Sequence, residues 1–147
     1  MDTRIATVDD ANELFELNTL FENTTTIENI RKSLEENNAE IVSIAFIDGI
    51  AAGYCCGLII KSMCYSENRA DIEALYVKEE FRRQGVGAAL IKCLENALAD
   101  LNILHFHINT HSNNVGAQSL YKGLGYCKTG EILMDKRYPA PNGTVSG

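Results

Sequence analysis

The sequence predicts a single domain of the mixed α/β class. Apolar residues recur at helical spacing in four segments, and in other segments they alternate or run together as in strands. Asp48-Gly49 separates two of the strand-like segments, and this pair is typical of a two-residue β-hairpin. A chain of 147 residues suits one domain and can bury a core of its own.

The first half is expected to hold two helices between strands. Asp9 or Asp10 can cap a helix that carries an apolar face, and the threonines at 24–26 mark a turn and cap before a second, more polar helix. In chain order, we expect a strand at 4–8, a helix from about 10 to 21, a helix from 27 to about Asn37-Asn38, and strands at 40–47 and 50–60.

After a loop at Ser66-Glu67-Asn68, the second half is expected to alternate between strands and helices. A stripe of Leu90, Ile91, Leu94 and Leu98 indicates a long helix, and Gly125 is placed to stop the last one. In chain order, we expect a strand at 70–77, a helix at 86–98, a strand at 104–109, a helix at 113–124, and a final pair of strands at 126–129 and 131–136.

Composition narrows the function classes. The net charge of −7 argues against a general nucleic-acid binder, which needs a basic stripe, and fits a positively charged partner. No apolar run approaches the ~20 residues of a membrane span, and the N-terminus lacks the pattern of a signal peptide. The five cysteines show no Cys-x-x-Cys spacing, so we expect free thiols in a reducing cytoplasm. Residues 1–138 are expected to form the domain and 139–147 a disordered tail.

After the strand at 70–77 come a glycine-containing loop and a helix, and this order of elements is typical of an anion-binding site. Residues 82–87 form a glycine-containing loop that opens directly into a helix, whose first amides lack intrahelical partners and sit at the positive end of its dipole. Gly85 and Gly87 let the backbone approach a ligand closely. A phosphate-binding P-loop would end in Gly-Lys-Ser/Thr, and a dinucleotide fingerprint would need Gly at Leu90, so neither common nucleotide loop fits.

Two segments carry a resemblance to a known family. Arg82-x-x-Gly85-x-Gly87-Ala88, preceded by Leu75-Tyr76-Val77, resembles the pyrophosphate loop of the GNAT superfamily of N-acetyltransferases. Downstream, Asn114, Ala117 and Tyr121, followed by Leu-Gly125-Tyr126, resemble the later signature of that superfamily, at the same separations and in the same order. The resemblance covers residues 5–137.

The resemblance implies a fold and a co-substrate. The fold would be a mixed, mostly antiparallel sheet of about seven strands with four helices, in which strands 4 and 5 splay apart to admit the pantetheine arm of acetyl-coenzyme A. Many members have Gly where Arg83 stands, so Arg83 must adopt a backbone angle that a non-Gly residue tolerates. By resemblance, the cofactor-binding residues would be Leu75, Tyr76, Val77, Arg82, Arg83, Gln84, Gly85, Val86, Gly87, Ala88, Asn109 and Asn114.

Two side chains are candidates for proton transfer. Tyr121 matches the family position that donates a proton to the leaving thiolate, and a phenol of pKa near 10 can serve a thiolate of pKa near 8.5. Glu73 is the leading candidate base for the attacking amine, and on a regular strand it would share a face with Asp71, Leu75 and Val77. Asp71 is the runner-up, and His111 is an alternative acid or base. Tyr121 and Glu73 also have purely structural interpretations: Tyr121 as a packing residue and Glu73 as a solvated carboxylate.

His105 and His107 are spaced to share a strand face, but they lack a third ligand at recognisable spacing, so no metal site is expected. The predicted activity is acetyl transfer from acetyl-coenzyme A to a primary amine, by direct attack, in the cytoplasm. The expected acceptor is a cationic small molecule such as an aminoglycoside or a polyamine. The alternatives are a protein amino group as acceptor or a non-catalytic acyl-coenzyme A sensor. Because dimers are common among small family members, a homodimer is also expected.

Overall fold

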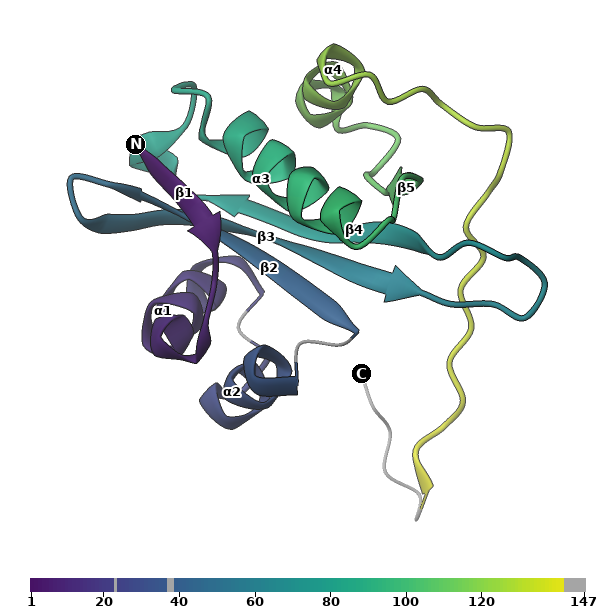
Figure 1. Cartoon of the computed structure of the whole chain (residues 1–147), viewed down its shortest axis with the longest axis horizontal. Helices are drawn as coiled ribbons and strands as arrows, with labels where there is room; N and C mark the ends of the chain where they lie inside the picture. The colour runs from purple at the N-terminus through teal and green to yellow at the C-terminus, as the bar shows by residue number, and fades with distance from the viewer. Residues whose placement is uncertain (23, 37–38, 142–147) are drawn as a thin grey trace.

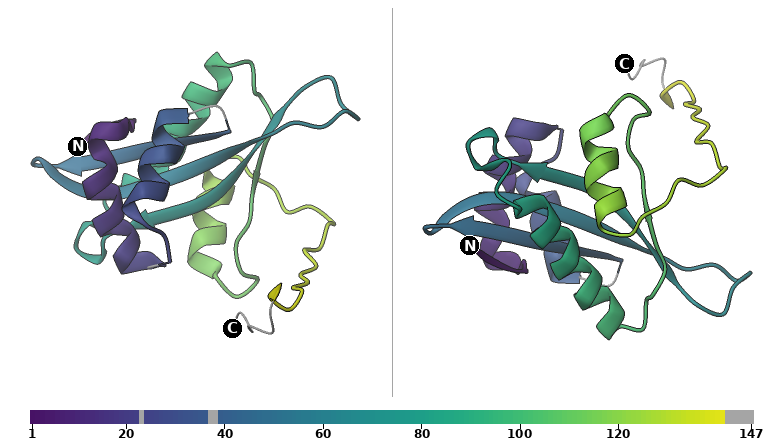
Figure 2. Two further views of the ribbon diagram at one scale, coloured as in Figure 1. Left: turned by 90° about the horizontal axis from the view of Figure 1, so that it is seen from below. Right: turned by 90° about the horizontal axis from the view of Figure 1, so that it is seen from above.

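The computed structural model describes residues 1–22, 24–36 and 39–141. In this part of the chain, one five-stranded sheet lies between two helical layers (Figures 1 and 2). The strands are β1 (Asp2–Ile5), β2 (Glu40–Ile47), β3 (Ile50–Ile60), β4 (Arg69–Val77) and β5 (Phe106–Ile108). The helices are α1 (Ala11–Phe21), α2 (Ile27–Glu36), α3 (Val86–Asp100) and α4 (Val115–Gly123).

The strands lie in chain order, β1-β2-β3-β4-β5. Neighbours are antiparallel except β4 and β5, which run parallel and pair through three positions, Ala70–Ile72 with Phe106–Ile108. Within the described residues, the rest of β4 from Glu73 to Val77 has no strand beside it on the β5 side. The sheet therefore opens between these two strands, as the sequence led us to expect.

Each face of the sheet packs against its own helices. On one face α3 buries a complete stripe, Leu90, Ile91, Leu94 and Leu98, and α4 packs beside it. On the other face α1 contributes Leu14 and Leu17 to a second core that contains Tyr54 of β3. The buried hydroxyl of Ser43 donates to the carbonyl of Leu90 at 2.9 Å, which fixes β2 against the middle of α3.

The first strand is shorter than predicted. It ends at Ile5 rather than at residue 8, because the chain turns at Thr7 into a single 3₁₀ turn, Val8–Asp10. The backbone amide of Thr7 donates to Oδ2 of Asp10 at 2.8 Å, and both carboxylate oxygens of Asp10 accept from Arg4 at 2.7 Å. Asp10, one of the two carboxylates expected to cap the helix, stands at the N-cap position of α1, but its side chain bonds to this turn and to the strand instead.

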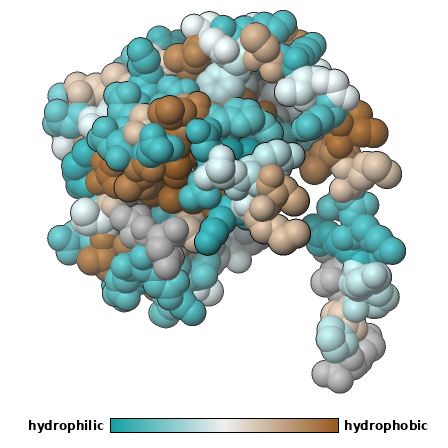
Figure 3. All heavy atoms as spheres, turned by 45° about the vertical axis from the view of Figure 1, so that its right-hand side comes forward, coloured by the Kyte–Doolittle hydropathy of each residue, from teal (hydrophilic) through white to brown (hydrophobic). Residues whose placement is uncertain are grey.

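The final pair of strands is a wrong prediction. The described residues contain five strands rather than about seven, and neither 126–129 nor 131–136 is a strand. Figures 1 and 3 show the C-terminal segment standing away from the body of the molecule, and Ile132, Leu133 and Met134 are each more than 80% exposed. An alternating apolar pattern makes a strand only when a partner edge lies beside it, and none does here among the described residues.

The remaining boundaries agree with expectation to within a few residues. The hairpin between β2 and β3 has Asp48 at φ 50° and Gly49 at φ 77°, the positive angles of a type I′ turn. The predicted end of the second helix, at Asn37-Asn38, and residues 142–147 of the predicted tail lie outside the described residues.

Candidate active site

The loop between β4 and α3 forms the part of the candidate site that could bind an anion. β4 ends at Val77, a 3₁₀ turn covers Glu79–Phe81, and α3 begins at Val86. Gly85 caps the helix in the left-handed conformation, at φ 81°, and a Cβ there would meet no atom within 4 Å beyond its chain neighbours. The amide of Ala89 makes the bond to the Gly85 carbonyl that opens the helix, so the amides before it have no intrahelical acceptor. An open, positively polarised cradle of amides fits a pyrophosphate.

Arg83 adopts a left-handed backbone, with φ 65°, in the same loop. From the sequence we expected a backbone angle that a non-Gly residue tolerates. A residue with a side chain does adopt this left-handed angle, but at a cost of about 1–2 kcal/mol. The side chain of Arg83 is exposed, so its charge can reach an anion at the loop.

Arg82 folds back onto the end of β4. Its Nε donates to the carbonyl of Val77 at 2.9 Å, and its guanidinium carbon lies 5.9 Å from the ring centre of Tyr76. The Val77 carbonyl, one of the backbone groups predicted to face the cofactor, therefore already accepts a hydrogen bond. Arg82 holds the loop against β4, a role that the sequence did not reveal.

Gly87 lies where β4, α3 and α4 meet. A Cβ on this residue would stand 3.4 Å from a methyl of Leu120 and 3.6 Å from a methyl of Leu75. The predicted cofactor strand, the loop helix and the helix of Tyr121 are therefore in direct contact. The structure brings these three elements of the two sequence signatures together.

Tyr121 lies on α4, which begins where the sequence predicted a cap. Oδ1 of Asn114 accepts from the amide of Ala117 at 3.1 Å, so Asn114 is the N-cap of that helix. Tyr121 is half-buried, packs its ring 6.3 Å from that of Tyr126, and lines a 90 Å³ cavity that Ile108 of β5 also lines. Burial raises the pKa of Tyr121, which keeps the phenol protonated at neutral pH.

Glu73 sits at an irregularity of β4 that the sequence did not signal. Cys56 of β3 pairs with Ala74, whereas the next residue, Gly57, pairs with Ile72, so Glu73 is an extra, bulged residue. Leu75 and Val77 consequently join the α3-side core with Ile72, while Ala74 and Tyr76 join the α1-side core. The prediction that Glu73, Asp71, Leu75 and Val77 share one face is therefore wrong, because the bulge reverses the alternation.

Asp71 is tied into a polar cluster before the bulge. Its Oδ1 accepts from Nε of Arg69 at 3.1 Å and lies 3.9 Å from Nδ1 of His107. These residues and Asn109 line a 340 Å³ cavity that the C-terminal segment borders. Asp71 is less free to act as a base than the exposed Glu73.

His105 directly precedes β5, His107 lies within it, and His111 lies in the loop that follows. His105 and His107 place their ring centres 4.7 Å apart, and His111 lies exposed before α4 with its carbonyl accepting from Gln118. In the described ranges, no group of three or more His, Cys, Asp or Glu side chains lies close enough to hold a metal ion.

Other site features were missed from sequence. The hydroxyl of Tyr126 donates to Oε2 of Glu95 at 2.6 Å and joins the end of α4 to α3. On the opposite face, Phe21 stacks on Tyr76 with ring centres 5.4 Å apart and stands edge-on to Tyr54 at 6.5 Å. The only signal in the sequence was the aromatic residue type, since cross-strand pairing of Tyr54 with Tyr76 depends on the register.

Comparison with known proteins identifies this arrangement. Residues 8–126 match the acetyltransferase (GNAT) family. The chain belongs to this family. The GNAT family comprises acetyl-coenzyme A-dependent N-acetyltransferases, and both signature segments of the present sequence fall inside the matched region.

Individual GNAT relatives are distant. An uncharacterised N-acetyltransferase of Methanocaldococcus jannaschii is 33% identical over 114 residues, covering 69% of each chain. Aminoglycoside N(6′)-acetyltransferase type 1 of Klebsiella aerogenes is 33% identical over 69 residues, which cover 47% of this chain and 45% of the relative. Human N-acetyltransferase 8 is 25% identical over 107 residues, or 73% of this chain and 47% of the relative. The matches thus span less than half the length of the last two.

Solved structures share the fold over nearly the whole chain. An aminoglycoside acetyltransferase from an uncultured soil metagenomic sample, in complex with sisomicin, superimposes with a TM-score of 0.82 at 15% identity, covering 95% of this chain and 96% of that one. Aminoglycoside N-acetyltransferase AAC(6′)-Iy in complex with CoA gives a TM-score of 0.78 at 20% identity, covering 92% and 93%. None of the helices in the described residues is long and apolar enough to cross a membrane.

Proposed function

We propose that this GNAT protein transfers an acetyl group from acetyl-coenzyme A to a primary amine of a cationic small molecule, such as an aminoglycoside or a polyamine. The observation that carries the proposal is the continuous path from the open edge of β4, at 73–77, to the amide cradle at the head of α3. An extended thioester arm and its pyrophosphate need such a strand edge and such an anion site in series.

In the proposed complex, the amides of 83–88 bind the pyrophosphate and Arg83 adds positive charge. The backbone edge of Leu75–Val77 pairs with the pantetheine arm and polarises the thioester carbonyl. Asn109, at the end of β5, and Asn114, beside α4, border the arm from the other side. The chemistry needs no metal ion, because backbone donors supply the polarisation.

The two proton transfers are assigned to Glu73 and Tyr121. An alkylammonium is almost wholly protonated at pH 7, so a base must remove a proton before the nitrogen attacks. Glu73 is an exposed, bulged residue two positions before Leu75, and it would take the proton directly or through water. Tyr121, whose pKa is raised by burial, keeps its proton and donates it to the departing thiolate.

A cationic acceptor is supported by charge and by the relatives. The chain has a net charge of −7, and both a distant homologue and structural neighbours are aminoglycoside acetyltransferases. We place the reaction in the cytoplasm and expect the protein to act there as a homodimer. The proposal is tested against two alternatives. In one, the acceptor is a protein amino group; in the other, the protein is a sensor that binds acyl-coenzyme A without turnover.

The test combines cofactor binding with a panel of amines. Acetyl-coenzyme A should bind the wild type in calorimetry, and free thiol should appear with one or more cationic amines. Gly85→Asp places a negative side chain in the cradle and should abolish binding in a folded protein, whereas Gly130→Asp, in the exposed C-terminal segment, should leave it unchanged. Unchanged affinity in a folded Gly85→Asp protein would refute the cradle. Cofactor binding without turnover on any amine would favour the sensor.

A further inference from the structure

A third cavity lies on the face of the sheet opposite α3. It holds about 150 Å³ between the α1–α2 helix pair and the sheet face formed by β2 and β3. Figure 1 shows α1 and α2 together beneath the sheet, on the side opposite α3. The polar side chains among its lining residues include Asn18 of α1, Ser33 of α2, Glu40 of β2, and Tyr54 and Cys56 of β3.

Two hydrogen-bond acceptors of this cavity are an amide oxygen on α1 and a carboxylate on β2. Nδ2 of Asn18 donates to the Tyr54 hydroxyl at 3.0 Å, but Oδ1 of Asn18 is buried and accepts no hydrogen bond from the described part of the chain. The carboxylate of Glu40 accepts from Ser33 Oγ at Oε1 and also from the thiol of Cys56. The described lining contains no Lys or Arg, so Glu40 carries the only charge in it. A group with several N–H donors and a positive charge would satisfy both acceptors, and an ammonium is such a group.

The rest of the wall suits a hydrocarbon chain. Leu14, Ile30 and Val42 line the cavity from three different elements. Methylene groups would be buried favourably against these side chains, whereas the hydroxyl groups of a sugar ring would lose water without gaining partners.

The cavity is also lined by residues of β3 that pair with β4, the strand at which the proposed acetyl transfer takes place. Cys56 pairs with Ala74 and Tyr54 with Tyr76, so the cavity-lining residues of β3 flank the stretch of β4 that begins at the Glu73 bulge. Burial raises the pKa of the Cys56 thiol well above its usual value, and the charges of Glu40 and Glu73 raise it further. The carboxylate in the cavity and the proposed base are therefore both close enough to Cys56 to affect its thiol.

We propose that the cavity holds the distal ammonium group of a linear, unbranched diamine acceptor, with Glu40 and Oδ1 of Asn18 as its partners. The other amine of the same molecule then lies at Glu73 for acetylation. This inference rests on the proposed function and selects among its acceptors, favouring a polyamine-like chain over an aminoglycoside.

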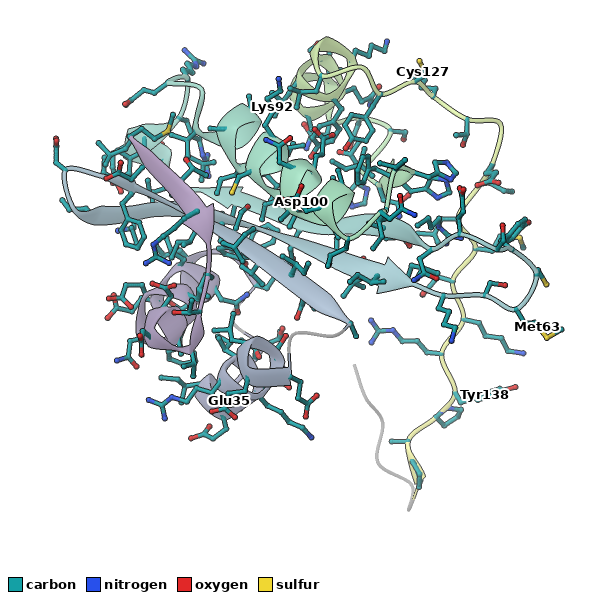
Figure 4. The ribbon with its side chains drawn as sticks, viewed as in Figure 1. Glu35, Met63, Lys92, Asp100, Cys127 and Tyr138 are labelled. Atoms are coloured by element: carbon teal, nitrogen blue, oxygen red, sulfur yellow. The ribbon has the colours of Figure 1, made fainter. Side chains whose placement is uncertain are left out.

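The experiment titrates 1,4-diaminobutane into the full chain by calorimetry, without acetyl-coenzyme A. Glu40→Gln and, separately, Asn18→Leu should each weaken binding at least tenfold. The matched control is Glu35→Gln, which removes the same charge from an exposed position on α2, on the outer side of the helix pair (Figure 4). It should change the affinity less than twofold, and 1-butanol should not compete.

The results distinguish a failure of the cavity proposal from a failure of the proposed function. Equal diamine affinity in the wild type and in both folded cavity variants, or no diamine binding to the wild type, would overturn the inference. If other amines still release thiol from acetyl-coenzyme A in that case, the proposed function survives alone. Diamine binding that depends on Glu40 and Asn18, without any thiol release, would instead keep the cavity site and refute the transferase.

Discussion

At the scale of single residues, Arg83 combines an unfavourable backbone angle with a proposed role in binding the cofactor. Its φ of 65° is unfavourable for a side-chain-bearing residue, and many GNAT members have glycine there. We predict that Arg83→Gly raises the free energy of unfolding by about 1 kcal/mol and weakens coenzyme A binding, because strain and charge are both removed. Denaturant unfolding and calorimetry measure the two effects separately. Arg83→Ala should lose affinity without gaining stability, and equal stability of the Gly and Ala variants would contradict the strain.

Asp10 makes a second residue-scale prediction. The hydrogen bond from Arg4 lowers the pKa of Asp10 most, and the Thr7 amide lowers it further, against the opposing effect of burial. A depressed folded-state pKa gives stability that is present above the unfolded value of about 3.9 and is lost as the pH falls through the folded value. Asp10→Asn should therefore cost about 2 kcal/mol at pH 7, and its difference from the wild type should shrink below about pH 4. Urea unfolding across pH checks this, and a difference independent of pH would contradict it.

At the scale of elements, α4 presents the proposed acid. Tyr121→Phe keeps the ring that packs against the α3-side core and removes only the hydroxyl. We predict a loss of turnover of about 10²-fold with unchanged coenzyme A affinity and little loss of stability. Tyr126→Phe is the matched control, since it removes a hydroxyl bound to Glu95. Turnover of Tyr121→Phe within about twofold of wild type would make this side chain a packing residue.

The elements also show what the sequence could predict. β2 and β3 were placed correctly because Asp48-Gly49 fixes a local hairpin, and α3 because four apolar residues repeat at helical spacing. The bulge at Glu73 was not predictable, since it arises from the register between β3 and β4 rather than from any local pattern. The loop proposed to bind the cofactor could be predicted locally, from its glycines, whereas the cavity assembled from α1, α2, β2 and β3 depends on tertiary packing and could not.

At the scale of the whole molecule, the C-terminal segment adds little to the packed core. Ile132, Leu133 and Met134 are each more than 80% exposed. We predict that truncation after Gly130 lowers the free energy of unfolding by less than about 1 kcal/mol, whereas Leu94→Ala in the core lowers it by about 2–5 kcal/mol. Thermal and urea unfolding of both variants test this. A large loss on truncation would mean that 131–136 pairs as a strand in solution, within one chain or between the two chains of a homodimer.

The separate positions of the two proposed sites along the chain have an evolutionary consequence. The lining of the diamine cavity comes entirely from residues 14–56, and every proposed cofactor and proton-transfer residue lies between 73 and 121. The β3–β4 connection, with the fully exposed Met63 at its tip (Figure 4), separates them. A single genetic crossover in this connection would exchange acceptor preference while leaving the acetyl-donor machinery intact. Chimaeras joined at 61–68 should therefore inherit their amine selectivity from the N-terminal parent and their coenzyme A affinity from the C-terminal one.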